Sequence, residues 1–105
     1  MIYSDDGTIE IDGNRYKVLA EEGEGGYEWA TIGLFEDGHG RRFVGADSGC
    51  SCTYFADYGL PRVWQPVSNF TEALAEGKKW FNDDAGSYYG ATLASFTDKL
   101  QRAYA

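Results

Sequence analysis

The segment that decides the fold is Tyr27-Glu28-Trp29-Ala30-Thr31-Ile32-Gly33-Leu34-Phe35-Glu36, which is typical of a β-strand. Successive side chains of a strand point to opposite faces, and here both faces are apolar. This pattern indicates a central strand that is covered on at least part of each side. The turn sequence Asp37-Gly38-His39-Gly40 follows, and residues 41–47 are predicted to return as the next strand. One face of the segment holds Tyr27, Trp29, Thr31, Gly33 and Phe35, and the other holds Ala30, Ile32 and Leu34.

Strand patterns continue toward the N-terminus. Residues 8–11 alternate, Asp12-Gly13-Asn14 provides the residues of a tight hairpin, and residues 15–21 form the partner strand. Glu22-Gly23-Glu24-Gly25-Gly26 is too rich in glycine to continue a strand and predicts a mobile, solvated loop. The first half of the chain therefore predicts a four-stranded antiparallel meander over about residues 8–48.

Helical patterns begin after residue 67, beyond a segment (49–67) that holds both cysteines and both prolines. Asn69 or Ser68 can begin a helix over about 69–81, with Glu72 placed as in a capping box. Apolar residues then recur at three or four positions across 88–104, which predicts a second helix. Strands followed by helices indicate a single α+β domain over residues 1–105, with both C-terminal helices packed on one face of the sheet. The predicted core consists of Trp29, Ile32, Leu34, Phe43, Leu74, Leu93, Phe96 and Leu100.

The net charge of −8 is concentrated in the first forty residues, which hold ten acidic side chains and two basic ones. Nucleic-acid affinity depends chiefly on lysine and arginine, so direct nucleic-acid binding is not expected. An acidic surface can instead steer a basic protein partner, or it can simply keep a small domain soluble. The carboxylates of Glu21, Glu22 and Glu24, in the predicted loop, are the candidate binding residues on this half.

Both cysteines lie in Asp47-Ser48-Gly49-Cys50-Ser51-Cys52. Their spacing rarely suits an intraloop disulfide, and two thiolates do not complete a zinc site. We therefore expect Asp47, Ser48, Cys50 and Cys52 to build a tight structural loop with reduced, metal-free, partly buried cysteines. Two alternatives remain: a cluster of Cys50, Cys52, Asp47 and His39 that binds a metal ion, and a redox or nucleophilic thiol.

Tyr58 and Trp64 lie in the proline-containing segment after the cysteines. Exposed aromatic residues often anchor protein interfaces, whereas buried ones cover the core beneath an irregular loop. Both possibilities stay open for this pair, and both residues are candidate binding residues. The sequence offers no acid–base or nucleophile constellation and implies no cofactor, so enzymatic activity is not expected.

A resemblance adds to this interpretation. The segment Asp47 to Cys52, with the aromatic strand before it and with Phe55, residues 68–75 and Trp80 after it, resembles a group of small uncharacterised proteins encoded by actinobacterial phages. The similarity covers roughly residues 14–81, and a proline that commonly follows the second cysteine is replaced here by Thr53. It implies a phage protein in the bacterial host cytoplasm with reduced cysteines, but no specific activity.

Two functions follow from these observations. The first is a non-enzymatic, acidic phage protein that binds a host or phage protein. The second is a small metal- or thiol-dependent protein that uses Cys50-Ser51-Cys52. The chain holds neither an apolar run of about 18 residues nor a signal-peptide pattern, so we expect no membrane segment and a cytoplasmic location.

Overall fold

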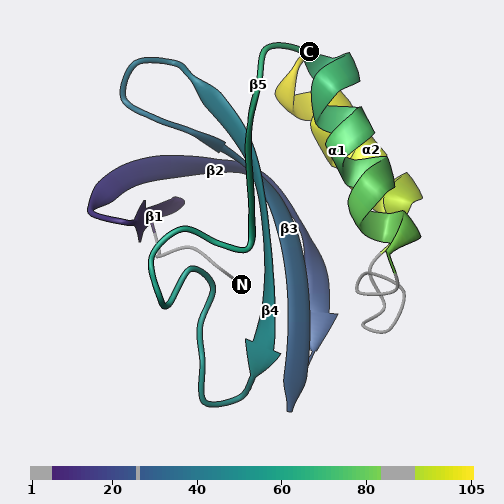
Figure 1. The fold of residues 1–105 in the computed structure, drawn as a ribbon. Helices are drawn as coiled ribbons and strands as arrows, with labels where there is room; N and C mark the ends of the chain where they lie inside the picture. The colour runs from purple at the N-terminus through teal and green to yellow at the C-terminus, as the bar shows by residue number, and fades with distance from the viewer. Residues whose placement is uncertain (1–5, 26, 84–91) are drawn as a thin grey trace.

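The computed structural model describes residues 6–25, 27–83 and 92–105. Its architecture is α+β, with an antiparallel sheet in the order β1-β2-β3-β4-β5 and two helices after it (Figure 1). The predicted meander and helices are confirmed, although the sheet has five strands where four were predicted. The elements are β1 (Thr8–Ile11), β2 (Asn14–Gly25), β3 (Glu28–Glu36), β4 (Arg42–Cys50), β5 (Val63–Val67), α1 (Phe70–Asn82) and α2 (Leu93–Ala103).

The helix boundaries lie close to the predicted ones. Asn69 is the N-cap of α1, and its side chain accepts a hydrogen bond from the Glu72 amide at 2.9 Å. Thr92 is the N-cap of α2, and its hydroxyl accepts a hydrogen bond from the Ser95 amide at 3.1 Å. The part of the second predicted helix at residues 88–91 lies outside the described residues.

The hydrogen-bond pattern of β4 follows from two bonds that bracket its ladder with β3. The Asp37 amide donates to the Arg41 carbonyl at one end, and the Ser51 amide donates to the Tyr27 carbonyl at the other. The register between these bonds is unbroken. In an antiparallel ladder, hydrogen-bonded and non-hydrogen-bonded pairs alternate. Odd-numbered residues of β4 therefore bond to β3, and even-numbered residues direct their backbone groups toward β5.

This alternation explains why the fifth strand was missed. No regular element was predicted for residues 49–67, which contain Pro66, and proline cannot donate a backbone hydrogen bond. In the structure Pro66 lies opposite Phe43, an odd-numbered position of β4 that directs its backbone groups toward β3. The missing N–H of Pro66 therefore faces the outer edge of the sheet, where the ladder needs no donor.

One face of the sheet packs against both helices (Figure 1). Ala30, Ile32 and Leu34 of β3 lie on this face, as the sequence alternation predicted. Gly77 lets the helices approach closely, because a Cβ there would lie 3.0 Å from the Phe96 ring. The buried residues of this layer are Ala20, Ala30, Ile32, Leu34, Val44, Ala46, Val67, Ala73, Trp80, Phe96 and Leu100.

The opposite face is covered by aromatic side chains and by the loop between β4 and β5. The Trp64 ring stacks on Phe43 with 4.9 Å between centroids, and Phe35 stacks on Phe55 of the loop at 5.5 Å. Gly45 lies directly opposite Trp64 and leaves room for its indole. Buried Ile11 and Tyr16 complete this second layer, so β3 is covered on both faces, as predicted.

The predicted core is only partly buried. Four of its members, Ile32, Leu34, Phe96 and Leu100, are fully buried. The other four, Trp29, Phe43, Leu74 and Leu93, are half-buried. The first group lies between the sheet and the helices, whereas Trp29 and Phe43 lie in the aromatic layer. That layer is closed by a loop rather than by a regular element, which leaves more of each ring exposed.

We predict that Gly45→Ala destabilises the protein through this aromatic layer. The new Cβ would lie 2.7 Å from Trp64 Cε3 and 3.1 Å from Phe35 Cε2, and the neighbouring rings limit how far either ring can withdraw. Overpacking of this kind lowers the free energy of unfolding by about 1–3 kcal/mol. Urea denaturation measures it. Gly38→Ala is the control, since a Cβ at Gly38 meets nothing within 4 Å and its effect should stay within about 0.5 kcal/mol. Equal stability of the two variants would contradict the prediction.

Candidate functional site

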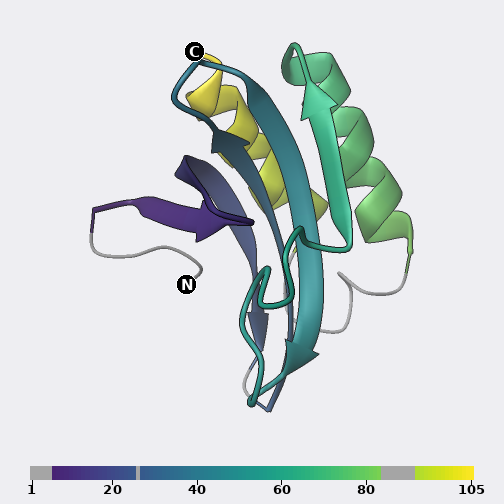
Figure 2. The ribbon, with the colours of Figure 1, turned by 60° about the vertical axis from the view of Figure 1, so that its left-hand side comes forward.

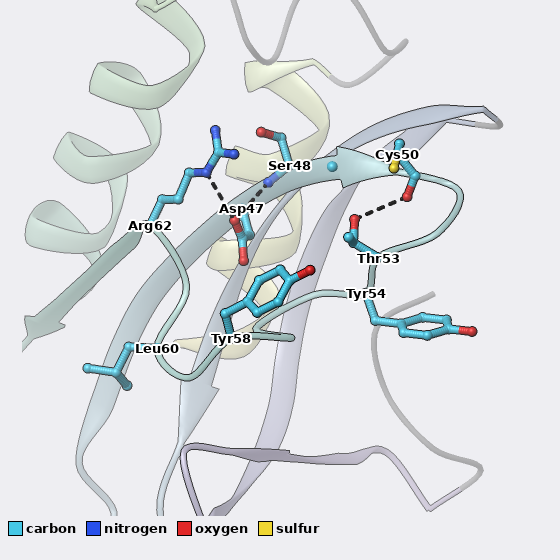
Figure 3. A pocket seen from close by; sticks show the side chains of 9 residues that line it. Asp47, Ser48, Cys50, Thr53, Tyr54, Tyr58, Leu60 and Arg62 are labelled. Carbon is cyan, nitrogen blue, oxygen red and sulfur yellow. Dashed lines mark hydrogen bonds and ion pairs between the residues drawn. The ribbon is translucent and has the colours of Figure 1, made fainter.

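The loop between β4 and β5 is fastened to the sheet by Asp47. One carboxylate oxygen, Oδ2, accepts a hydrogen bond from the Ala56 amide at 3.2 Å, and the other, Oδ1, accepts one from the Ser48 amide at 3.0 Å. Arg62 Nε lies 3.6 Å from Oδ1, so the far end of the loop meets the same carboxylate (Figure 3). Asp47 thus contacts both halves of the loop, and its structural importance stays a prediction.

The loop begins with a tight turn over Cys50 to Thr53. The Cys50 carbonyl accepts hydrogen bonds from the Thr53 amide at 3.1 Å and from the Thr53 hydroxyl at 3.1 Å (Figure 3). It accepts a third from Trp29 Nε1 at 2.9 Å, and this indole N–H also reaches the Thr53 carbonyl at 3.2 Å. Trp29, a residue of β3, therefore holds this turn against the sheet.

The two cysteines are joined in a disulfide, Cys50–Cys52, and the expectation that they are reduced is wrong for this structure. The expectation assumed that a one-residue spacing directs the two side chains apart. Here the chain turns sharply at Ser51, which brings the Cα atoms of Cys50 and Cys52 to 5.4 Å, inside the ordinary range for a disulfide. Cys52 is exposed rather than partly buried.

A pocket of about 390 Å³ lies between the end of β4 and this loop (Figure 3). Three of its apolar side chains are exposed to solvent: Tyr54 (74%), Tyr58 (88%) and Leu60 (51%). We call these three residues the tyrosine patch. The remaining lining residues are Asp47, Ser48, Gly49, Cys50, Thr53 and Arg62.

The two aromatic candidates from the sequence lie in different surroundings. Tyr58 is exposed and belongs to the tyrosine patch. Trp64 is half-buried, with Phe43, Phe35 and Tyr16 around its ring, and it takes no part in the pocket. Tyr54 and Leu60 were not singled out in the sequence. The available signal was several aromatic and apolar residues in a segment whose prolines prevent a helix.

The acidic candidates lie in a strand, so the predicted loop at residues 22–26 is wrong for residues 22–25. Glu22 pairs with Ile32 of β3, and its carboxylate lies 3.2 Å from Lys99 Nζ of α2. The same ammonium donates to the Glu21 carbonyl at 2.8 Å. These contacts fasten α2 to β2, a role that the sequence did not reveal. A binding role for Glu21, Glu22 and Glu24 stays a prediction.

The proposed metal cluster is not assembled. His39 lies in the turn between β3 and β4, whereas Cys50 lies at the other end of β4. Within residues 6–25, 27–83 and 92–105, no three His, Cys, Asp or Glu side chains are close enough to hold a metal ion.

A larger hollow of about 680 Å³ lies at the opposite end of β4. Its two arginines already have internal partners. Arg42 Nε lies 2.9 Å from Glu36, and Arg41 Nε lies 2.7 Å from Asp37. Partial burial acts to raise the pKa of Asp37, but hydrogen bonds from the His39 amide and from Arg41 outweigh it and hold that pKa below its ordinary value. This hollow therefore offers little unused charge to a ligand, and the pocket beside the tyrosine patch is the better candidate.

The structure defines a small α+β domain with helices on one face of its sheet and a loop-bordered pocket on the other. The chain belongs to the family described as Domain of unknown function (DUF7574), whose model matches residues 15–105. Neither the curated proteins nor the solved structures include a significant match to this chain. In the described part of the chain, neither helix is long and apolar enough to cross a membrane.

We predict that Asp47→Ala lowers the free energy of unfolding by about 1–3 kcal/mol, because two backbone amides lose a charged acceptor. Guanidinium denaturation measures the change. Asp57→Ala removes an exposed carboxylate from the same loop and should change stability by no more than about 0.5 kcal/mol. A stability loss that is the same for both variants would show that Asp47 does not anchor the loop.

We also predict that protein purified and denatured without reductant resists alkylation by iodoacetamide at both cysteines. The disulfide leaves no thiol to react, and the intact mass should be lower than that of the reduced chain by two hydrogen atoms. Intact-protein mass spectrometry before and after reduction measures both quantities. Alkylation of both cysteines in the unreduced sample would refute the disulfide.

Proposed function

We propose that this chain is a non-enzymatic phage protein that binds a host or phage protein in the cytoplasm of the infected bacterium. The observation that carries the proposal is the tyrosine patch: three large apolar side chains, each more than half exposed, around one pocket. Tyrosine combines a large apolar ring with a hydroxyl that forms hydrogen bonds, and it is enriched in the residues that dominate protein interfaces.

The polar groups of the pocket support binding rather than catalysis. The Asp47 carboxylate accepts two backbone hydrogen bonds and lies beside Arg62, so it serves to position the loop. The excess of acidic residues in the first forty positions favours a protein partner over a nucleic acid. Long-range attraction to such a surface would also accelerate association with a basic partner.

We predict that Tyr58→Ala weakens binding to the partner at least about tenfold, equivalent to about 1.4 kcal/mol. The partner is captured from host lysate on the wild-type protein, purified, and titrated by calorimetry against each variant. Lys78→Ala is the control, because Lys78 is exposed on α1, across the sheet from the pocket, and should bind as the wild type does. Equal affinities of Tyr58→Ala, Tyr54→Ala and the wild type would refute the tyrosine patch as the binding surface.

A second candidate function, thiol chemistry at Cys50 and Cys52, also has support. Cytosolic disulfides are usually transient and take part in catalysis or redox sensing, and Cys50–Cys52 lies at an exposed turn. A chain that acts by thiol exchange would reduce or oxidise a captured partner, and Cys52→Ser would abolish this exchange. A Cys50→Ser, Cys52→Ser double variant with unchanged partner binding and no exchange in the wild type would favour the binding protein.

A further inference from the structure

β4 extends beyond its neighbour at the pocket. β5 pairs with β4 only from Arg42 to Ala46. Among the described residues, the last four residues of β4, 47–50, therefore pair with β3 on one side and have no strand on the β5 side. Figure 2 shows β5 beside one half of β4, while the connecting loop runs past the other half. The pocket lies against this uncovered edge, with the tyrosine patch on its other side.

The alternation in β4 gives the direction of the backbone groups at this edge. Odd-numbered residues bond to β3, so Ser48 and Cys50 direct their N–H and C=O groups toward the side where β5 would continue. If β5 began two residues earlier, the same register would place Pro61 opposite Ser48. Proline has no N–H to donate to the Ser48 carbonyl. The sequence therefore ends the strand at the position where a donor is required.

Two of the four edge groups have partners inside the chain. The Ser48 amide donates to the Asp47 carboxylate, and the Cys50 carbonyl accepts from Trp29 and from Thr53. The other two groups, the Ser48 carbonyl and the Cys50 amide, point toward the side of β4 on which the pocket lies. One acceptor and one donor, two residues apart on the same edge, match the backbone of an extended peptide.

We infer that this edge binds an extended segment of the partner protein as an additional strand, antiparallel to β4 and in line with β5. The inference rests on the proposed binding function and specifies its mode. The segment would donate an N–H to the Ser48 carbonyl and accept a hydrogen bond from the Cys50 amide. The tyrosine patch would contact its side chains.

The register also specifies one side chain of the partner. The residue opposite Gly49 would point to the face that carries Tyr58, beside the Thr53 and Trp29 side chains that lie over Gly49. On the same face of the sheet, β5 places the large Trp64 opposite Gly45 of β4. We therefore infer a large apolar or aromatic residue at that position of the segment, which fits the apolar lining of the pocket.

The experiment uses a random dodecapeptide library selected on the whole wild-type protein and counter-selected on Tyr58→Ala. The selected peptide is then synthesised with a single N-methyl group at each position in turn, and calorimetry measures each affinity. Strand addition predicts that methylation weakens binding at least about tenfold at two positions separated by one residue, those opposite Ser48 and Cys50, because only these two amides face the open edge of β4. Methylation at the position between them should change the affinity less than about twofold.

The outcomes separate the two proposals. A peptide that requires Tyr58 but shows no alternation overturns strand addition and leaves the tyrosine patch as a binding surface. A library that yields no Tyr58-dependent peptide overturns both. A wild-type protein that dimerises through this edge in sedimentation experiments, and that Tyr58→Ala renders monomeric, identifies a second copy as the occupant and overturns the inference of a partner segment.

Discussion

The structure depends on the unbroken antiparallel ladder between β3 and β4. Its register fixes which side chains of both strands face the helices and which face the loop. It also fixes which backbone groups of β4 are used by β3 and which point toward β5. A shift by one residue would exchange the two faces of β4 and carry Val44 and Ala46 away from the helices. The helix layer, the aromatic layer and the uncovered edge all follow from this one alignment.

The two faces of β3 are covered by different means. Helices cover one face, and a short loop covers the other with stacked rings. Rings need space above the sheet, which Gly33 and Gly45 provide where Phe35 and Trp64 lie. A loop buries less than a helix does, so apolar side chains remain exposed at its tip. The candidate binding surface is thus a consequence of how the second face is closed.

The sequence predicted the two-faced central strand, the meander and both helices, because apolar alternation and helical spacing are local properties. It missed β5, because a proline fits in this strand only at a position whose backbone nitrogen faces away from β4. The alignment of β5 with β4 decides this, and no local sequence pattern shows that alignment. The sequence also assigned Glu22 to a loop because of the glycines around it. The pairing with β3 and the ion pair with Lys99 that hold Glu22 in a strand join residues far apart in the chain. Tyr58 was found by its residue type, whereas the pocket around it required the folded loop. The disulfide was missed because residue spacing alone does not show where the chain turns sharply.

The central claim is that the backbone groups of β4 alternate and that Pro61 leaves the end of its outer edge uncovered. Native-state amide hydrogen exchange, followed by NMR, tests it directly at single residues. The account predicts that the Val44 and Ala46 amides, which face β5, are strongly protected. The Cys50 amide, which faces the open edge, should exchange at least about a hundredfold faster. A Cys50 amide as protected as that of Ala46 would contradict the account.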